Sequence, residues 1–281
     1  MKNFSYLKPD TLKKTVKEFR KSEDPFYLAG GTDLIALMHD GIIIPGSVID
    51  LKHVSELDGK IIETDHGLRI GALATMTDLI ESDLIQKFIP FLADAARLHS
   101  SPGIQNRATI GGNLVNASPA ADMAPPLMVL DAILIASKGG KDREIPITRF
   151  FKGVKRNSLR SGEILKEILI PDYKDIKGFF YKKSRIKLVD LAMVNMSLAK
   201  VKGTFRISIG ACAPVPLRIK SAEKVLNNTD VFDQKLIRRI GRICSKKIKP
   251  ISDLRGSAGY RIELVNVNIQ RLLSQLTNTG E

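Results

Sequence analysis

The chain has 281 residues, of which 43% are hydrophobic and 26% charged, a composition that excludes a disordered, collagen-like or disulfide-stabilised chain. Its two cysteines are too few to ligate an iron–sulfur cluster or an all-thiolate zinc site, and its four histidines lack metal-ligand spacing. No apolar stretch is long enough to span a bilayer, and the N-terminus has no signal-peptide pattern. We therefore expect a cytoplasmic chain with no metal site of its own and no membrane span.

Charge is distributed unevenly along the sequence. Residues 1–140 carry a net charge of −3, whereas residues 141–281 carry +17. The basic half is either a solvated surface or a docking face for a partner. Nucleic acid is not expected, because aromatic residues are not interleaved with the basic ones in the way that nucleic-acid-binding proteins require.

Hydrophobic periodicity predicts alternating strands and helices in the first third of the chain. The first helix should begin near Asp10, with Asp10 or Thr11 as its N-cap. The predicted elements are a strand at 4–6, this first helix, a strand at 26–29, a helix from 34, a strand at 47–51, a hairpin of 60–63 with 68–71, and helices at 77–86 and 88–98.

Antiparallel strands dominate the prediction for the rest of the chain. A passage rich in glycine and proline covers residues 100–126, and two helices close the sequence. The predicted elements are a hairpin of 132–137 with 143–147, strands at 163–170, 179–182, 191–201 and 205–211, and helices at 233–248 and 260–276.

The change of pattern near residue 174 predicts a domain boundary. We expect an N-terminal domain of residues 1–173, with lobes of about 1–57 and 58–173, and a C-terminal domain of residues 174–281 in which an antiparallel sheet packs with helices. The predicted fold class is α+β.

Two glycine-containing loops are the first candidates for a binding site. They consist of Ala29, Gly30, Gly31, Thr32 and Asp33, and of Thr109, Ile110, Gly111, Gly112 and Asn113. Glycine permits positive φ and a close approach of ligand to backbone, and successive N–H groups in such a turn bind anions. Neither loop matches the dinucleotide-binding or P-loop fingerprint, and a simple tight turn is the alternative use of each.

A run of small residues follows the second loop. It contains Ser118 and ends at Asp122, and its backbone is accessible enough for a flat ring system to lie on it. Asp122 is a candidate acceptor for sugar or ribityl hydroxyl groups. The alternative is that Asp122 caps a helix over residues 123–130.

These segments occur in the order and spacing of a known family. The motifs on which the resemblance rests are Leu28-Ala-Gly-Gly-Thr-Asp-Leu34, Ile49-Asp-Leu51, Ile70-Gly-Ala72, Asn106-Arg-Ala-Thr-Ile-Gly-Gly-Asn-Leu114, Ala117-Ser-Pro-Ala-Ala-Asp122 and Arg255-Gly-Ser-Ala-Gly-Tyr-Arg261. The chain resembles, over nearly its whole length, the FAD-binding medium subunit of molybdenum hydroxylases, the carbon monoxide dehydrogenase and xanthine dehydrogenase family.

The resemblance implies a two-lobed FAD domain of the vanillyl-alcohol oxidase/PCMH type, followed by a smaller flavoprotein domain. By that likeness the two glycine loops bind the pyrophosphate of FAD, Ser118 and Asp122 lie along its ribityl chain, and Lys182 lies near the isoalloxazine, with Lys183 as the competing assignment. A cation there would raise the flavin potential. No catalytic base is expected, and because neither loop contains histidine, FAD should be bound non-covalently.

The resemblance also implies partner chains, a molybdopterin-binding large subunit and a [2Fe–2S] small subunit, assembled as a dimer of heterotrimers. Electrons would pass from the clusters through FAD to NAD⁺, a quinone or oxygen. Gln105 and Ile186 depart from the family pattern, and Ile186 places an acceptor-side role of its loop in doubt. The alternatives are a stand-alone FAD oxidoreductase and a flavin-free scaffold on the same fold.

Overall fold

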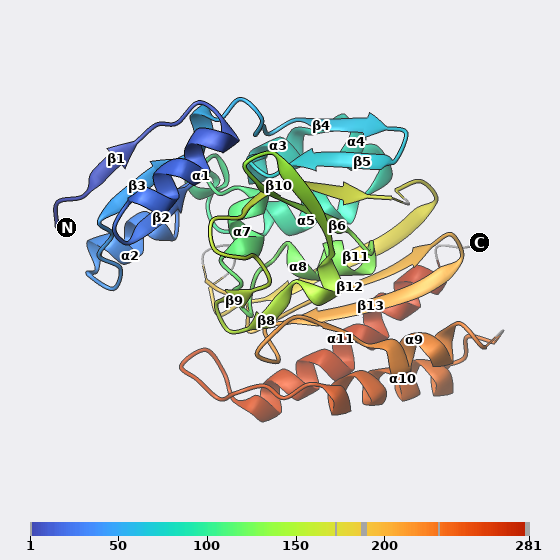
Figure 1. The fold of residues 1–281 in the computed structure, drawn as a ribbon. Coiled ribbons are helices and arrows are strands. Elements are labelled where there is room, and N and C mark those ends of the chain that lie inside the picture. Colours follow the sequence, from blue (N-terminus) through green and yellow to red (C-terminus); the bar gives the residue numbers. More distant parts are fainter. Residues whose placement is uncertain (1, 172, 187–189, 230, 279–281) are drawn as a thin grey trace.

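The computed structural model describes residues 2–171, 173–186, 190–229 and 231–278. Three sheets of three, five and four strands and one two-stranded ribbon make up its β-structure, and helices cover the sheets (Figure 1). Fold class α+β is confirmed.

The first sheet is small and entirely parallel. Its strand order is β1-β3-β2, so the central strand β3 pairs with both neighbours. Helix α1 begins after Thr11, whose side chain accepts a hydrogen bond from the Lys14 N–H, so Thr11 rather than Asp10 is the N-cap. The elements are β1 (Ser5–Leu7), α1 (Leu12–Lys21), β2 (Pro25–Leu28), α2 (Leu34–His39), β3 (Ser47–Asp50) and η1 (Leu51–His53).

The five-stranded sheet is antiparallel, with the order β4-β5-β10-β6-β7, and its apolar face packs against a group of helices. Gly139 and Gly140 adopt positive φ in the tight turn between β6 and β7, as the predicted hairpin requires. The elements are β4 (Ile61–Thr64), β5 (Gly67–Gly71), α3 (Met76–Glu81), α4 (Asp83–Phe88), α5 (Pro90–Arg97), α6 (Pro102–Gln105), α7 (Ile110–Val115), α8 (Ala124–Val129), β6 (Ile133–Lys138), β7 (Lys141–Pro146), η2 (Ile147–Arg149), β8 (Phe151–Gly153), β9 (Arg156–Asn157) and β10 (Ile164–Ile170).

The helices of this region differ from the prediction at three points. The helix expected over 77–86 is two helices, because Ser82 is extended and caps the N–H of Ile85 at the start of α4. The glycine- and proline-rich passage 100–126 contains the short helices α6 and α7 and the start of α8. The predicted capping role of Asp122 is wrong, since the N-cap of α8 is Met123 and no side chain caps it.

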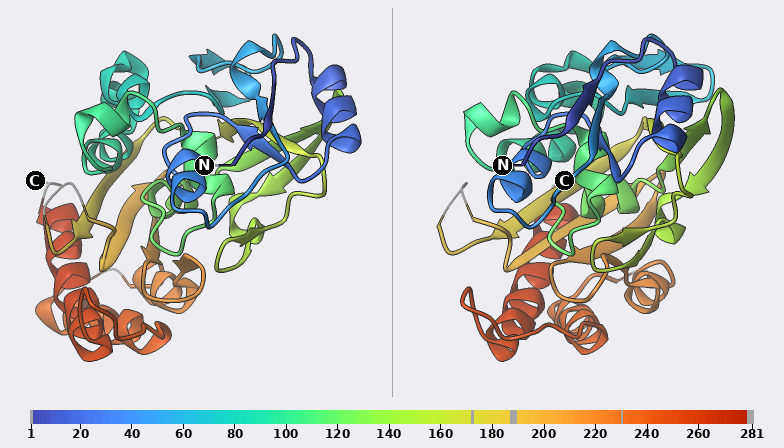
Figure 2. Two further views of the ribbon diagram at one scale, coloured as in Figure 1. Left: turned by 90° about the vertical axis from the view of Figure 1, so that its left-hand side faces the viewer. Right: turned by 60° about the vertical axis from the view of Figure 1, so that its left-hand side comes forward.

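The four-stranded C-terminal sheet is covered on both faces. On one face, Ala199 and Val201 of β12 join the core around α5 and α8; on the other, Val194, Met196 and Leu198 pack with α10 and α11. Figure 2 shows α10 and α11, in red, at the end of the molecule opposite the small parallel sheet, in blue. The elements are β11 (Ile176–Lys183), β12 (Val194–Val201), β13 (Thr204–Gly210), β14 (Leu217–Arg218), α9 (Lys220–Leu226), α10 (Gln234–Lys247) and α11 (Ala258–Asn278).

The prediction for this region misplaced two strand starts and missed several short elements. β11 begins at Ile176 rather than at residue 179, and β12 begins at Val194 rather than at 191. α9 and the strands β8, β9 and β14 are too short to show a periodicity in the sequence.

Helix α10 presents a strongly basic exposed face. Its buried side holds Leu236, Ile240 and Cys244, and its exposed side carries Lys235, Arg238, Arg239, Arg242, Lys246 and Lys247. Within the described ranges, none of the helices is both long and apolar enough to cross a membrane.

Candidate functional site

The first glycine loop connects β2 to α2. Gly31 has a φ of +81°, a conformation that L side chains rarely adopt. The Lys52 ammonium group donates to the carbonyl oxygen of Ala29, the first residue of the loop, at 3.3 Å. In the described part of the chain, the backbone N–H groups of Gly30, Gly31, Thr32 and Asp33 have no intramolecular hydrogen-bond partner. These four N–H groups are therefore available to an anion.

Asp50 supports this loop through Lys52. Its carboxylate accepts from the Lys52 ammonium group at 2.6 Å and from the Lys52 N–H at 2.9 Å, and it also accepts from the Tyr6 hydroxyl. Burial alone would raise the pKa of Asp50, but the bonds from Lys52 and Tyr6 hold this pKa below its usual value. Asp50 stays ionised at neutral pH and holds the Lys52 side chain against the loop.

The two loop regions meet at Gly30. A Cβ at this position would lie 1.9 Å from the carbonyl oxygen of Arg107, so only glycine permits this approach. An open groove of about 540 Å³ borders the contact, and its lining residues come from the first loop, α2 and the segment before the second loop: Gly30, Gly31, Thr32, Ile35, Ala36, His39, Asp40 and Arg107.

The second loop uses its N–H groups differently. The N–H groups of Ile110 and Gly111 donate to the carbonyls of Ala74 and Ala72, and the N–H groups of Gly112 and Asn113 donate to the Thr109 side chain and carbonyl. A Cβ on Gly111 would lie 2.6 Å from the Ala72 oxygen. This loop is thus anchored to the β5–α3 connection, and Gly111 serves close packing against that connection.

The small-residue run after the second loop lies against that loop. The Asn113 side chain accepts from the Met123 N–H at 3.2 Å, and the half-buried Ser118 hydroxyl accepts from the Ala120 N–H at 3.3 Å. Lys155 bonds the Asn116 side chain at 2.7 Å and lies 3.9 Å from the Asp33 carboxylate. Lys155 therefore links the small-residue run, through Asn116, to Asp33 of the first loop.

Asp122 and Lys182 form a buried ion pair. The Lys182 ammonium group lies 2.8 Å from the Asp122 carboxylate and also donates to the carbonyl of Leu98 at 2.8 Å. The same carboxylate lies 3.1 Å from His99 Nδ1 and accepts from the Asn195 amide at 3.0 Å. The side chains of Lys182 and Asp122 are only 4% and 5% exposed. We call His99, Asp122, Lys182 and Asn195 the Asp122 cluster.

The competing lysine and the two departures from the family pattern have distinct surroundings. Lys183 is exposed, whereas Lys182 belongs to the buried cluster. Gln105 is buried and donates to the carbonyls of Arg97 and Ser100, which fixes the turn ahead of the second loop. Ile186 is 52% exposed.

Sequence reasoning missed four residues of this region: His99, Arg107, Lys155 and Asn195. His99 and Asn195 join Asp122 from positions 23 and 73 residues away, so no local pattern identifies them. Arg107 lies inside the second motif, two residues before Thr109, and this place in the motif was the signal that the sequence did offer. Only the structure shows that Arg107 lies beside the first loop.

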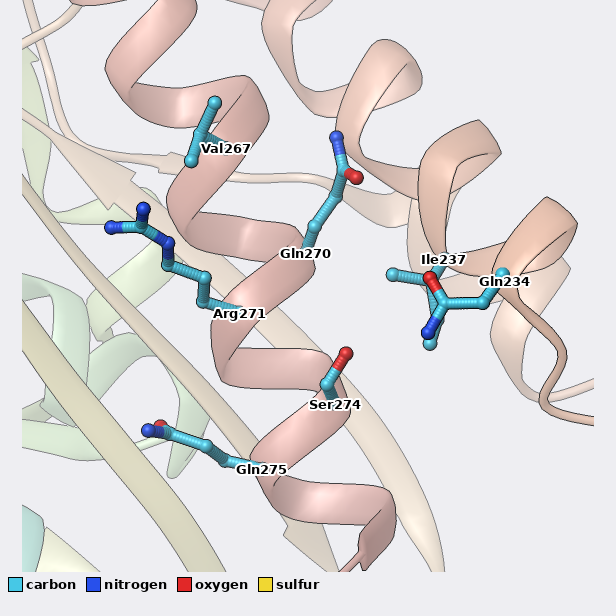
Figure 3. A pocket seen from close by; sticks show the side chains of 7 residues that line it. All are labelled: Gln234, Ile237, Val267, Gln270, Arg271, Ser274 and Gln275. Carbon is cyan, nitrogen blue, oxygen red and sulfur yellow. The ribbon is translucent and has the colours of Figure 1, made fainter.

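A second groove lies far from the loops, between α10 and α11. It has a volume of about 460 Å³, and its lining mixes polar and apolar side chains (Figure 3). Gln270 and Ser274 of α11 point toward α10, whereas Arg271 and Gln275 point away from it.

Comparisons with known proteins match both parts of the chain. Residues 2–173 match the family described as the FAD binding domain in molybdopterin dehydrogenase, and residues 179–276 match the CO dehydrogenase flavoprotein C-terminal domain. The glyceraldehyde dehydrogenase medium chain of Sulfolobus acidocaldarius is 31% identical and aligns over 94% of this chain and 95% of its own length. The xanthine dehydrogenase FAD-binding subunit of Escherichia coli O157:H7 is 29% identical and aligns over 96% of this chain and 95% of its own length.

Solved structures show the same fold throughout. A carbon monoxide dehydrogenase from Hydrogenophaga pseudoflava superimposes with a TM-score of 0.93 at 28% identity, covering 99% of this chain and 98% of its own. Quinoline 2-oxidoreductase from Pseudomonas putida 86 gives 0.91 at 25% identity, covering 99% of each chain.

The glycine loops fit the cofactor of these relatives, because free N–H groups and the Arg107 side chain are suited to a pyrophosphate and one glycine admits no Cβ. The chain belongs to the molybdopterin dehydrogenase FAD-binding family and is an FAD-binding medium subunit of the molybdenum hydroxylase type, an oxidoreductase flavoprotein.

Proposed function

We propose that this chain relays electrons from [2Fe–2S] clusters of a small subunit, through non-covalently bound FAD, to an external acceptor. The clusters would receive electrons from a molybdopterin-binding large subunit that oxidises the substrate, and the complex would be a dimer of heterotrimers. The observation that carries the proposal is the match to medium chains, which covers nearly the full length of this chain and of each relative.

The two cysteines of the chain support a cluster on another subunit. Cys212 and Cys244 are both buried, and burial raises the pKa of each thiol to about 12. A protonated, buried thiol is a poor cluster ligand and a poor electron carrier. FAD, when bound, supplies the electron storage, and we assign no acid or base catalyst on this chain.

We propose that the first loop (Ala29, Gly30, Gly31, Thr32, Asp33) and the second (Thr109, Ile110, Gly111, Gly112, Asn113) hold the FAD pyrophosphate, with unequal shares. The first would donate its free N–H groups. The second has four of its five N–H groups paired, so it would contribute mainly shape, and the nearby Arg107 would supply charge. Ser118 would lie along the ribityl chain, and Lys182 beside the isoalloxazine.

We propose that the basic face of α10 docks against an acidic surface of a partner subunit. Six cations lie on this exposed side between residues 235 and 247, and within the described ranges none of them has a salt-bridge partner on this chain. Such a field attracts an acidic surface and speeds association at low ionic strength.

The test is purification of the tagged chain from cells that produce it naturally, followed by measurement of FAD, iron and molybdenum. We expect iron and molybdenum in fixed proportion to FAD. Reversing two charges of α10, Arg238→Glu with Arg242→Glu, should reduce the metal that copurifies; Lys13→Glu with Lys17→Glu on α1 is the matched control. A metal-free yellow chain that turns over a diffusible substrate would instead make it a stand-alone oxidoreductase.

A further inference from the structure

The Asp122 cluster joins four separate parts of the chain. Asp122 precedes α8, Lys182 lies on β11, Asn195 on β12, and His99 with the Leu98 carbonyl follows α5. Met123, next to Asp122, donates to the Asn113 side chain, which connects the cluster directly to the second loop. The cluster therefore borders the proposed FAD site from the side of the C-terminal sheet.

The Asp122 carboxylate is already largely occupied by protein donors. An ionised carboxylate has about four acceptor sites. One oxygen faces both Lys182 and His99, at 2.8 and 3.1 Å, and the other accepts from Asn195 at 3.0 Å. Asp122 is also 4% exposed, which leaves little of its carboxylate for a ribityl hydroxyl.

Lys182 depends on this carboxylate. A buried ammonium ion without a counter-charge is costly, and its desolvation is offset here by one ion pair and one carbonyl. The two charges cancel at a distance of 2.8 Å, so a group beside the cluster meets a neutral pair rather than a free cation.

We propose that Asp122 acts on bound FAD as the counter-ion of Lys182, and that this pair, rather than the lysine alone, sets the local charge that the flavin meets. The proposal rests on the function proposed above and deepens it. His99 and Asn195 are positioning residues, because each holds the Asp122 carboxylate toward Lys182.

The pair makes two single changes act in opposite directions. Reduction adds electron density to the flavin, so an uncompensated cation favours it and an uncompensated anion opposes it. Asp122→Asn should therefore raise the flavin potential, Lys182→Met should lower it, and the double variant should return it close to the original value.

Asp122→Asn is suited to this test because its new amide has an acceptor nearby. The side-chain oxygen of Asn195 is buried and lacks a hydrogen-bond partner in the described structure. The Asn195 nitrogen faces Asp122 in the original chain, so the Asn195 amide would turn over by 180° and present this oxygen to position 122. An amide at position 122 would then donate to that oxygen and still accept from Lys182, so the variant should fold.

The experiment measures the midpoint potential and the dissociation constant of FAD for the full chain and for the variants D122N, K182M, D122N/K182M and K183M. We expect D122N and K182M each to change the reduction equilibrium about tenfold, in opposite directions, which corresponds to about 30 mV for a two-electron couple. The double variant should lie within threefold of the original chain, and K183M, which alters the adjacent exposed lysine, should match it.

Four results separate the possible outcomes. Equal potentials in all proteins, or single variants that shift in the same direction, would overturn the counter-ion role. Loss of FAD binding in D122N with an unchanged potential in K182M would also overturn it and assign Asp122 to the ribityl chain. Failure of the original chain to bind FAD would refute the proposed function itself.

Discussion

Gly30 and Gly31 are neighbours that meet different physical constraints. Gly30 lies so close to the Arg107 carbonyl that a side chain would force the two loop regions apart. Gly31 is required for its backbone conformation, with a φ of +81° and its N–H group free. The first glycine therefore allows the two loop regions to meet, and the second shapes the backbone that would meet the ligand.

Gly31→Val should weaken FAD binding at least tenfold. Valine at positive φ costs on the order of 1–3 kcal/mol, and its Cβ would lie 3.0 Å from the Leu28 side chain, so the loop must shift. The measurement is fluorescence quenching of FAD titrated with apoprotein. Gly41→Val is the matched control, because Gly41 has a φ of +70° but has no atom within 4 Å of its Cβ position. Undiminished affinity in Gly31→Val would remove this loop from the pyrophosphate site.

The ionised Asp253 carboxylate, which pairs with Arg261, makes the free energy of unfolding depend on pH in the acid range. Hydrogen bonds from Arg255 hold the pKa of Asp253 well below its usual range, and the buried Arg261 guanidinium donates to it at 2.7 Å. Because the folded-state pKa is lowered, the stabilisation is complete above about pH 4 and is lost as the pH falls through the folded-state value.

Asp253→Asn should lower the free energy of unfolding by about 1–2 kcal/mol at pH 7. Urea unfolding at pH 7, 4 and 2.5 should show nearly the same difference between the variant and the original chain at pH 7 and 4, and a smaller difference at pH 2.5. Asp10→Asn, which removes an exposed pair with Lys14, should leave stability almost unchanged. A stability difference that is the same at every pH would contradict the assignment to the Asp253 charge.

At the scale of elements, the packing of α5 on β11 depends on one strand glycine. A Cβ on Gly178 would lie 2.8 Å from the ring of Phe91 and 3.0 Å from the Ala199 side chain. Phe91 is 1% exposed and has no room to withdraw. The absence of a side chain at residue 178 lets α5 lie directly on β11.

Gly178→Ala should destabilise the chain by about 1–3 kcal/mol, the usual cost of overpacking a core. Thermal or urea unfolding measures it. Phe91→Leu should cost less in the Gly178→Ala background than in the original chain, because the smaller side chain relieves the clash. Gly103→Ala is the control: with nothing within 4 Å of its Cβ and a helical backbone, it should be neutral or stabilising. Additive effects of the two substitutions would contradict direct contact.

The elements that the sequence predicted well are those with a strong local signal. The hairpin of β6 and β7 has alternating strands around two glycines, and α10 has a clear apolar stripe. The short helices α6 and α7 were missed because each is too brief for a period to be read, and the break at Ser82 depends on a single cap.

At the scale of the whole molecule, the sequence located the loops but not their partners. Gly30–Gly31 and Gly111–Gly112 were identifiable because glycine pairs in motif context are local features. The pairing of Lys182 with Asp122 spans 60 residues and depends on how β11 packs beside the start of α8, which no local pattern specifies. For the same reason the sequence prediction assigned Asp122 and Lys182 to separate parts of FAD.

The close approach of Gly30 to Arg107 has a consequence beyond binding. The groove at this contact is complete only when the segment that carries Gly30 packs against the segment that carries Arg107. FAD would then bind to the docked arrangement alone and stabilise it by mass action. The yellow colour that the chain retains on a column would thus serve as a built-in indicator that these two segments have packed correctly, visible without any label.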